Sequence, residues 1–448
     1  MANPPDCDTR LAVTATHGPE LVRAIGRWSL VALTVNSIIG SGVFGLPSEV
    51  ARLTGTASPV AVLISGAAIG VIMACYAEVA SYFADAGGPY LYSREAFGRL
   101  VGIETGWMLW LAQLSAPAAN ANLFVIYLGQ FWHRANAPLP RFLLLAFLVG
   151  LLALVNYRGV RAGTEVSNLF TVAKLLPLGL VIVAGAVYLA AGYKAAPMNQ
   201  LHAGTNGWLE AILLMVFAYG GFESALAPMS EAKNPARDAA FALFVALLCC
   251  SLVYTLMQWV VVGVLANPAS GQRPLAEVAS LALGRGGATL VTLGVLVSLY
   301  GYLSAKMVGV PRITYALAEG GDFPGIFAAV HPRFHTPHIS ILAFAALTWL
   351  LALFGSFSWN VTLSAVARLF YYGIGCAALP ILRRKLPGKA QFRLPGGVLL
   401  SFLGVAVCLV LVTRVDTSKS LILLGTVMAA LVNWLCVRGA SSPGTSRS

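Results

Sequence analysis

Two apolar stretches of the sequence are interrupted by glycine-rich segments whose backbone could bind a ligand. The first is Asn36–Pro47, and the second is Phe217–Ser224, where Gly220 and Gly221 precede the carboxylate of Glu223. Non-helical backbone at membrane depth is stable only where it is buried in protein or lines a water-filled cavity. The N–H groups at a helix N-terminus suit a carboxylate, and freed carbonyl groups suit an ammonium. Together the two segments predict a site for the two charged ends of an α-amino acid.

Two other interpretations apply to the first segment. Gly40 to Gly45 spells G-x-G-x-x-G, the dinucleotide-binding pattern, but that motif requires a preceding strand in a βαβ unit. The apolar surroundings exclude this interpretation. Close packing between helices through small residues stays open as the alternative, since Gly66 and Gly70 in the next apolar stretch form the ordinary packing pattern of this kind.

The elements that must position these residues are membrane helices. Hydrophobic residues make up 58% of the 448 positions and charged residues 10%, whereas soluble domains have about 25% charged residues. This composition excludes a soluble enzyme, a disordered chain and a disulfide scaffold. A spanning helix needs about 20 apolar residues. Twelve such segments are predicted, at 26–47, 58–83, 100–131, 140–157, 165–191, 208–229, 239–265, 288–318, 339–355, 359–382, 397–413 and 419–437. We therefore expect an all-α polytopic membrane protein with twelve transmembrane helices.

The two interrupted segments occupy corresponding positions in this series, because they lie in the first and the sixth predicted span. Transporters built from two inverted five-helix repeats place their substrate site where the first helix of each repeat is broken. The spacing of the interruptions therefore predicts such a pair of repeats.

The net charge of +12 does not indicate nucleic-acid binding, because the basic residues follow the predicted topology. With both termini on one side, eighteen of the 29 lysines and arginines fall on that side, eight fall on the other and three lie within spans. Cytoplasmic loops carry the excess of basic residues. We expect both termini in the cytoplasm of a bacterial cell, with the protein in the inner membrane. The polar stretch before Trp28 resembles no signal peptide, so the first span is predicted to be an uncleaved anchor.

The cysteines and histidines predict no metal site. The seven cysteines form no C-x-x-C pair and are interpreted as small core residues. His331, His335 and His338 have ligand-like spacing, but Pro332 and Pro337 break any helix that would align them. Since no nucleophile with a base is recognisable either, we expect neither enzyme activity nor a cofactor.

At the level of motifs the chain resembles the amino acid, polyamine and organocation transporter superfamily. The similarity runs from about residue 24 to residue 386. It is carried by stretches typical of the first, second, sixth and eighth helices: Gly40–Phe44, Tyr76–Ala80 with Ala86–Tyr90, Gly221–Ser224 with Glu231–Arg237, and Ala316–Pro324 with Thr336–Pro337.

This resemblance implies a leucine-transporter-type fold. A cytoplasmic tail would occupy 1–25, the two five-helix repeats 26–191 and 192–386, the two additional helices 387–438, and a second cytoplasmic tail 439–448. The last two helices are the expected contact of a possible homodimer.

The resemblance also implies roles for individual backbone groups. Around Gly40, the amides of Ser41 and Gly42 would hold the substrate carboxylate. The carbonyls of three residues would receive its ammonium: Ile38, Phe217 and Gly220. The ring of Phe217 would close the site from the outer side.

Ionisable residues inside spans are functional by default, because each is costly at mid-membrane unless it is partnered. Lys174 matches a lysine that takes the place of a sodium ion in sodium-coupled relatives. Glu223 would face the substrate cavity, where it matches an acidic position linked with proton sensing. Lys306 reaches the position where arginine/agmatine exchangers place a tryptophan, and its charge would repel a guanidinium. Two amides of the third span, Gln113 and Asn120, would add polar contacts. A further ionisable residue of the spans, Arg368, is given only an internal partner.

The expected function is therefore sodium-independent transport of an amino acid by alternating access, with proton linkage or exchange. A neutral or acidic substrate is favoured. Two alternatives stay open: an exchanger of cationic amino acids or polyamines, and a membrane sensor or accessory subunit that does not transport.

Overall fold

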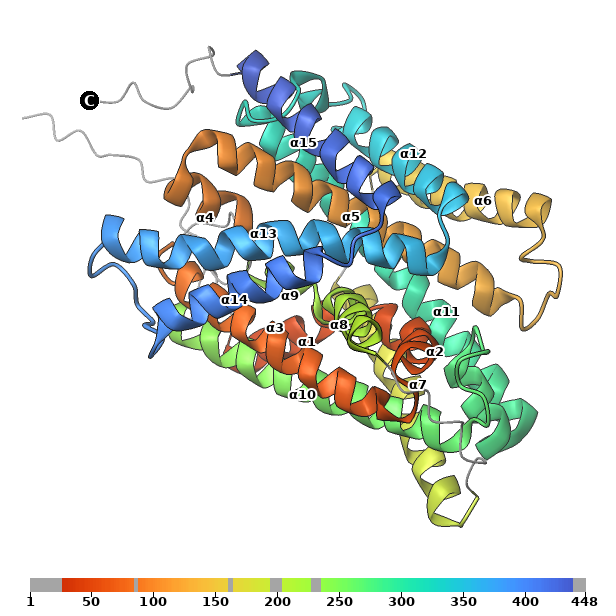
Figure 1. Cartoon of the computed structure of the whole chain (residues 1–448). Helices are drawn as coiled ribbons and strands as arrows, with labels where there is room; N and C mark the ends of the chain where they lie inside the picture. The colour runs from red at the N-terminus through yellow and green to blue at the C-terminus, as the bar shows by residue number, and fades with distance from the viewer. Residues whose placement is uncertain (1–25, 84–87, 160–163, 194–203, 227–234, 438–448) are drawn as a thin grey trace, which may run out of the picture.

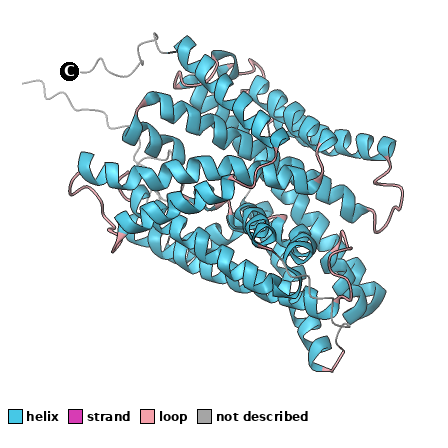
Figure 2. Ribbon diagram, viewed as in Figure 1, coloured by secondary structure: helices cyan, strands magenta, loops and turns pink. Residues whose placement is uncertain are grey.

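The structure is a computed structural model that describes residues 26–83, 88–159, 164–193, 204–226 and 235–437. All regular elements in these ranges are helices, and they form a bundle of long rods (Figures 1 and 2). The expected tails at 1–25 and 439–448 and the segment at 227–234 lie outside the described residues. The helices are α1 Arg27–Ile38, α2 Gly42–Thr54, η1 Gly55–Ala57, α3 Ser58–Ala80, α4 Gly88–Phe97, α5 Arg99–Leu128, α6 Pro138–Tyr157, α7 Thr164–Ala190, α8 Thr205–Tyr219, α9 Phe222–Ala225, α10 Pro235–Val264, α11 Pro274–Glu319, η3 Gly325–Ala328, α12 His338–Phe354, α13 Phe357–Lys385, α14 Gly397–Val412 and α15 Thr417–Val437.

Many of these helices are suited to a lipid environment. Within the described ranges, seven helical stretches are long and apolar enough to cross a membrane, the run from α2 through α3 counted as one. Four apolar helices are shorter: Lys174–Ala190, Thr205–Tyr219, His338–Phe354 and Gly397–Val412. Large apolar side chains such as Phe147, Leu248 and Phe354 are exposed on the outside of the bundle. Lipid rather than water is the solvent that such a surface fits.

Two predicted spans are broken at short segments. The first is helical as α1 up to Ile38 and resumes as α2 at Gly42, so the break is limited to residues 39–41 and is narrower than the glycine-rich segment suggested. The second is α8 up to Tyr219 and α9 from Phe222 onward. Gly221 has φ of 113°, in the left-handed region that favours glycine, and this conformation ends α8.

The two broken helices lie side by side within the bundle (Figure 1). The half-helix α2 packs against α8, while α1 packs against α9. Around this pair, α5 packs against α13, α7 packs against α11, and α3 packs against α10. The core that results is formed from both halves of the chain.

Two helical regions were not expected from the sequence. Helix α4 occupies part of the predicted loop after the second span, and its Tyr90 and Arg94 contact Asp322 far along the chain. Helix α11 begins at Pro274, with non-helical backbone at Gly284 inside it, instead of beginning at 288. Both regions contain charged residues, so neither forms a continuous apolar run that the sequence would mark as a span. Parts of both are nevertheless buried by tertiary packing.

Candidate functional site

A small cavity of about 20 Å³ lies between the two broken helices. One wall is the first break with the residues beside it: Ser37, Ile38, Gly40, Ser41 and Gly42. The opposite wall is the second break with the end of α8: Phe217, Ala218, Gly220 and Gly221. Side chains from three further helices complete it: Asn120, Tyr302, Lys306 and Arg368. The structure therefore brings both interrupted segments to one buried space.

The N-terminus of α2 lies at this space, because Ser41 and Gly42 line it. Ser41 is the N-cap residue, and its carbonyl accepts the first helical bonds from the N–H groups of Phe44 and Gly45 at 3.1 and 3.0 Å. The amides that precede these have no acceptor within a helix. An anion is favoured at such a helix end by the helix dipole and by the N–H groups themselves.

Two polar atoms of the cavity wall are buried without a hydrogen-bond partner among the described residues: Ser41 Oγ and Asn120 Oδ1. Their residues are each 1% exposed. Asn120 uses its Nδ2 group to donate to the carbonyl of Ala116 at 2.8 Å, which leaves Oδ1 as an acceptor. Buried polar atoms in native proteins are nearly always hydrogen-bonded, so an unpartnered donor and acceptor on one cavity suit a polar ligand.

The carbonyl groups around the breaks are partly occupied. The Tyr254 hydroxyl lies 3.2 Å from the Ile38 carbonyl oxygen and 3.0 Å from that of Ala218, so it joins the two broken helices. The Phe217 carbonyl accepts a bond from the N–H of Gly220 at 3.2 Å. Each carbonyl oxygen has two lone pairs and keeps capacity for an ammonium.

Glycine allows the two broken helices to approach each other closely. A Cβ atom placed on Gly42 would lie 2.8 Å from both Cα and Cβ of Ala218, and one placed on Gly221 would collide with the carbonyl of Ser37. At Gly40 the nearest atom would be 3.8 Å away, on the ring of Tyr302. Small-residue packing therefore explains Gly42 and Gly221, whereas a Cβ atom at Gly40 would make only ordinary van der Waals contacts.

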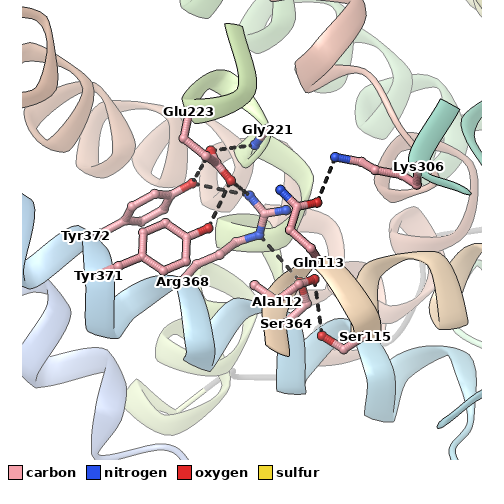
Figure 3. A network of polar contacts seen from close by, with 10 residues as sticks. All are labelled: Ala112, Gln113, Ser115, Gly221, Glu223, Lys306, Ser364, Arg368, Tyr371 and Tyr372. Atoms are coloured by element: carbon pink, nitrogen blue, oxygen red, sulfur yellow. Dashed lines mark hydrogen bonds and ion pairs between the residues drawn. The ribbon is translucent and has the colours of Figure 1, made fainter. Parts of the chain in front are cut away.

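Glu223 does not face the cavity as the sequence suggested. Figure 3 shows its carboxylate enclosed by Arg368, Tyr371, Tyr372 and the N–H of Gly221. The Arg368 Nη1 group donates to Oε1 at 2.5 Å, the two tyrosine hydroxyls donate at 2.9 and 3.0 Å, and the Gly221 amide donates at 2.9 Å. The carboxylate that was expected on the cavity wall is thus covered by a guanidinium that lines the wall itself.

Lys306 lies on the cavity wall and contacts Gln113, which is not among the residues that line the cavity. Its ammonium donates to Gln113 Oε1 at 2.8 Å and lies 5.5 Å from the centre of the Tyr302 ring. Figure 3 shows the Gln113 amide between Lys306 and the guanidinium of Arg368. The structure thus brings the third and eighth predicted spans to this wall.

Lys174 lies beside α1 rather than on the cavity wall. Its ammonium donates to the backbone carbonyl of Asn36 at 2.8 Å and to the side-chain oxygen of the same residue at 2.9 Å. These acceptors precede the break at residue 39 by less than one helical turn. A fixed positive charge at the C-terminal end of α1 interacts favourably with the helix dipole there.

Sequence reasoning missed the positions of three residues at the site. Tyr302 precedes Lys306 by four residues on one helix, so helical spacing alone could have placed it on the same face. Arg368 was noticed as a buried charge, but nothing local indicated that it lines the cavity beside Gly220. Tyr254 gives no signal in the sequence, because its contacts join segments that are 36 and 216 positions away.

These features define a helical membrane protein with a buried polar cavity between two broken helices. Residues 25–431 match the family model of the amino acid permeases, so the chain belongs to that family. Its members are multi-pass membrane transporters, and the chain is accordingly a transporter rather than an enzyme.

Characterised relatives cover most of the chain. The branched-chain amino acid permease BcaP of Bacillus subtilis (strain 168) is 26% identical over 89% of this chain and 90% of its own length. The serine/threonine exchanger SteT of the same organism is 27% identical over 84% of this chain and 87% of its own length. The vacuolar cationic amino acid transporter 4 of Arabidopsis thaliana is 31% identical over 75% of this chain, and the match spans 59% of that longer protein.

Proposed function

We propose that the protein transports an amino acid across the cytoplasmic membrane by alternating access. The observation that carries this proposal is the cavity between the breaks, with unpartnered Ser41 Oγ and Asn120 Oδ1 on its wall. The substrate carboxylate would bind the amides at the start of α2 and the hydroxyl of Ser41. Its ammonium would bind the carbonyls of Ile38, Phe217 and Gly220 and the oxygen of Asn120.

The proposed topology is twelve transmembrane helices with both termini in the cytoplasm, the first ten helices forming two inverted five-helix repeats. Helix packing supports the repeats. An inverted repeat relates the third predicted span to the eighth and the fifth to the tenth. The contact of α5 with α13, spans three and ten, would then be equivalent to the contact of α11 with α7, spans eight and five. The bias of basic residues supports the orientation.

Transport is proposed to be independent of sodium, with either exchange of amino acids or proton linkage. The position of Lys174 supports the first part. Its ammonium is already bound to two oxygen atoms of Asn36 next to the break, at a place where a coupling cation would otherwise be needed.

The names of the relatives do not select a substrate, because they include carriers of branched-chain, hydroxylated and cationic amino acids. The cavity itself favours a neutral or acidic one. Lys306 and Arg368 line it, and cationic side chains would be repelled there.

Counterflow into liposomes that contain the purified protein tests the proposal. The liposomes are loaded with a mixture of unlabelled amino acids, and entry of each labelled amino acid is followed, with protein-free liposomes as the control. We expect accumulation of at least one amino acid with sodium or choline outside. Binding of an amino acid without any counterflow or net uptake would instead favour a sensor, and absence of both would reject the proposal.

A further inference from the structure

Positively charged side chains outnumber negatively charged ones on the cavity wall. Of the described residues that line it, Lys306 and Arg368 are cationic and none is acidic. The carboxylate of Glu223 does not line the cavity; it is bound to Arg368, and its residue is 4% exposed. A zwitterionic substrate adds no net charge, so it would leave the ammonium of Lys306 without a counter-charge in a buried site.

Arg368 keeps hydrogen-bonding capacity beyond the bonds that it makes to described residues. Its bonds to described residues use Nη1, toward Glu223 and Tyr372, and Nε, toward Ser364. A guanidinium carries five N–H donors in a fixed fork, so the Nη2 group can still bind an anion. The guanidinium also packs directly against the backbone of Gly220, where a Cβ atom would overlap with it.

Gln113 occupies the position between the two cations. Its oxygen is a neutral acceptor for Lys306, and the side chain is 6% exposed. A neutral amide satisfies the geometry of an ammonium but not its charge. A carboxylate would satisfy both, because hydrogen bonds between charged partners are stronger than those between a charged and a neutral group.

We propose that Lys306 and Arg368 bind the side-chain carboxylate of the substrate, which makes acidic amino acids the preferred substrate class. The inference rests on the proposed function, since it needs the α-carboxylate and α-ammonium to be bound at the breaks. In this arrangement the second carboxylate replaces Gln113 Oε1 as the partner of Lys306 and accepts a bond from Arg368 Nη2.

Binding of isosteric pairs tests the proposal. Dissociation constants of the purified protein in detergent are measured for glutamate and glutamine and for aspartate and asparagine, since each pair differs in the side-chain carboxylate alone. We expect at least tenfold tighter binding of one acid than of its amide. In Lys306→Gln this preference should fall at least fivefold, while Lys385→Gln, a change of an exposed lysine at the end of α13, should leave it unchanged.

A second variant covers the case in which Lys306→Gln does not fold. The double variant Glu223→Gln with Arg368→Gln removes the ion pair without leaving one buried charge, and it too should reduce the preference for the acid. The proposal is overturned if acids and amides bind equally well, or if a folded variant keeps the full preference. The proposed function survives that result as long as any amino acid is bound and transported, and it fails separately if none is.

Discussion

The glycines of the first broken helix face different surroundings, although they are two residues apart. A side chain on Gly42 would meet the backbone of Ala218 at 2.8 Å, whereas one on Gly40 would stay 3.8 Å from the ring of Tyr302 and project toward the cavity. Their substitution should therefore have opposite effects on stability and on binding.

We predict that Gly42→Ala lowers the free energy of unfolding by about 1–3 kcal/mol, the usual effect of overpacking. Gly40→Ala should leave it unchanged or raise it by about 0.4–1 kcal/mol, because its φ is not in the left-handed region. The methyl group should nevertheless weaken substrate binding several-fold. Thermal unfolding and binding are measured on the same preparations. Equal destabilisation by the two changes would contradict this assignment.

Two buried glutamates offer a second comparison of single residues. Neither oxygen of Glu104 has a hydrogen-bond partner among the described residues, and its side chain lies within the span of α5. The carboxylate of Glu223 has four bonds, one of them from Arg368. Burial of an unpartnered charge is costly, while removal of one partner from a buried ion pair leaves the other uncompensated.

We therefore predict that Glu104→Gln, measured at pH 8, leaves the unfolding temperature unchanged or raises it. Glu223→Gln should lower stability by about 3–5 kcal/mol, since Arg368 then stays buried without its counter-charge. Unfolding of both variants in one detergent gives the comparison. A clear loss of stability in Glu104→Gln would reveal a partner outside the described residues.

At the scale of elements, the site depends on the two helix ends at the first break. In an unbroken helix, the backbone groups at these ends would be hydrogen-bonded to the next turn. At the end of α1, the carbonyl of Asn36 accepts a hydrogen bond from the ammonium of Lys174. The start of α2 lines the cavity. A lysine fixed at a helix C-terminus can stabilise an arrangement for which sodium-coupled transporters need an ion.

Lys174→Ala should accordingly abolish uptake and leave the protein folded, because two oxygen atoms of Asn36 lose their positive partner at the break. In the unmodified protein, replacement of sodium by choline should not change the initial rate. The two parts are separable by experiment: uptake that depends on sodium would contradict the surrogate role, even if the variant is inactive. Lys385→Ala is the matched control.

The sequence predicts local features of these elements better than contacts between them. The breaks near Gly40 and Gly221 were recognisable, because glycine weakens a helix at its own position. The apolar runs likewise gave most helix ends to within a few residues. Helix α4 was missed because its stability comes partly from contacts of Arg94 with Asp322, which lie 228 positions apart. The same holds for Arg368: its charge was visible, but its position beside Gly220 depends on how α13 packs against α8.

At the scale of the whole molecule, one end of the bundle is held by a cluster around Asp322, which follows α11. Arg94 of α4 and Arg99 of α5 each donate to its carboxylate at 2.7 Å, and Tyr90 donates to it as well. Asn433 of α15 donates to its backbone carbonyl at 2.8 Å. Under the proposed orientation this end faces the cytoplasm, so the cluster would join four elements where the inner side of the transporter must open.

We predict that Asp322→Asn weakens this closure. The change removes the charge but keeps the size of the side chain, and hydrogen bonds to a charged group contribute roughly 1.5–3 kcal/mol. The unfolding temperature should fall, and a cysteine placed at Gly106 of α5, which borders Tyr90 and Phe323, should react faster with maleimide. Unchanged reactivity and unchanged stability would together show that the cluster does not hold this end closed.

The same cluster predicts a dependence on alkaline pH. Burial, together with the hydrogen bond to Asp322, raises the pKa of the Tyr90 phenol to about 12, whereas an unperturbed tyrosine has a pKa of about 10. The folded protein therefore holds this proton more tightly than the unfolded chain does. The stability that results is fully present below pH 10 and is lost as the pH rises toward 12. In Tyr90→Phe this contribution is absent, so its unfolding temperature should fall less steeply between about pH 10 and 12 than that of the unmodified protein. Other groups that titrate in the same range affect both proteins alike, and parallel curves would therefore mean that the phenol contributes nothing to the closed end.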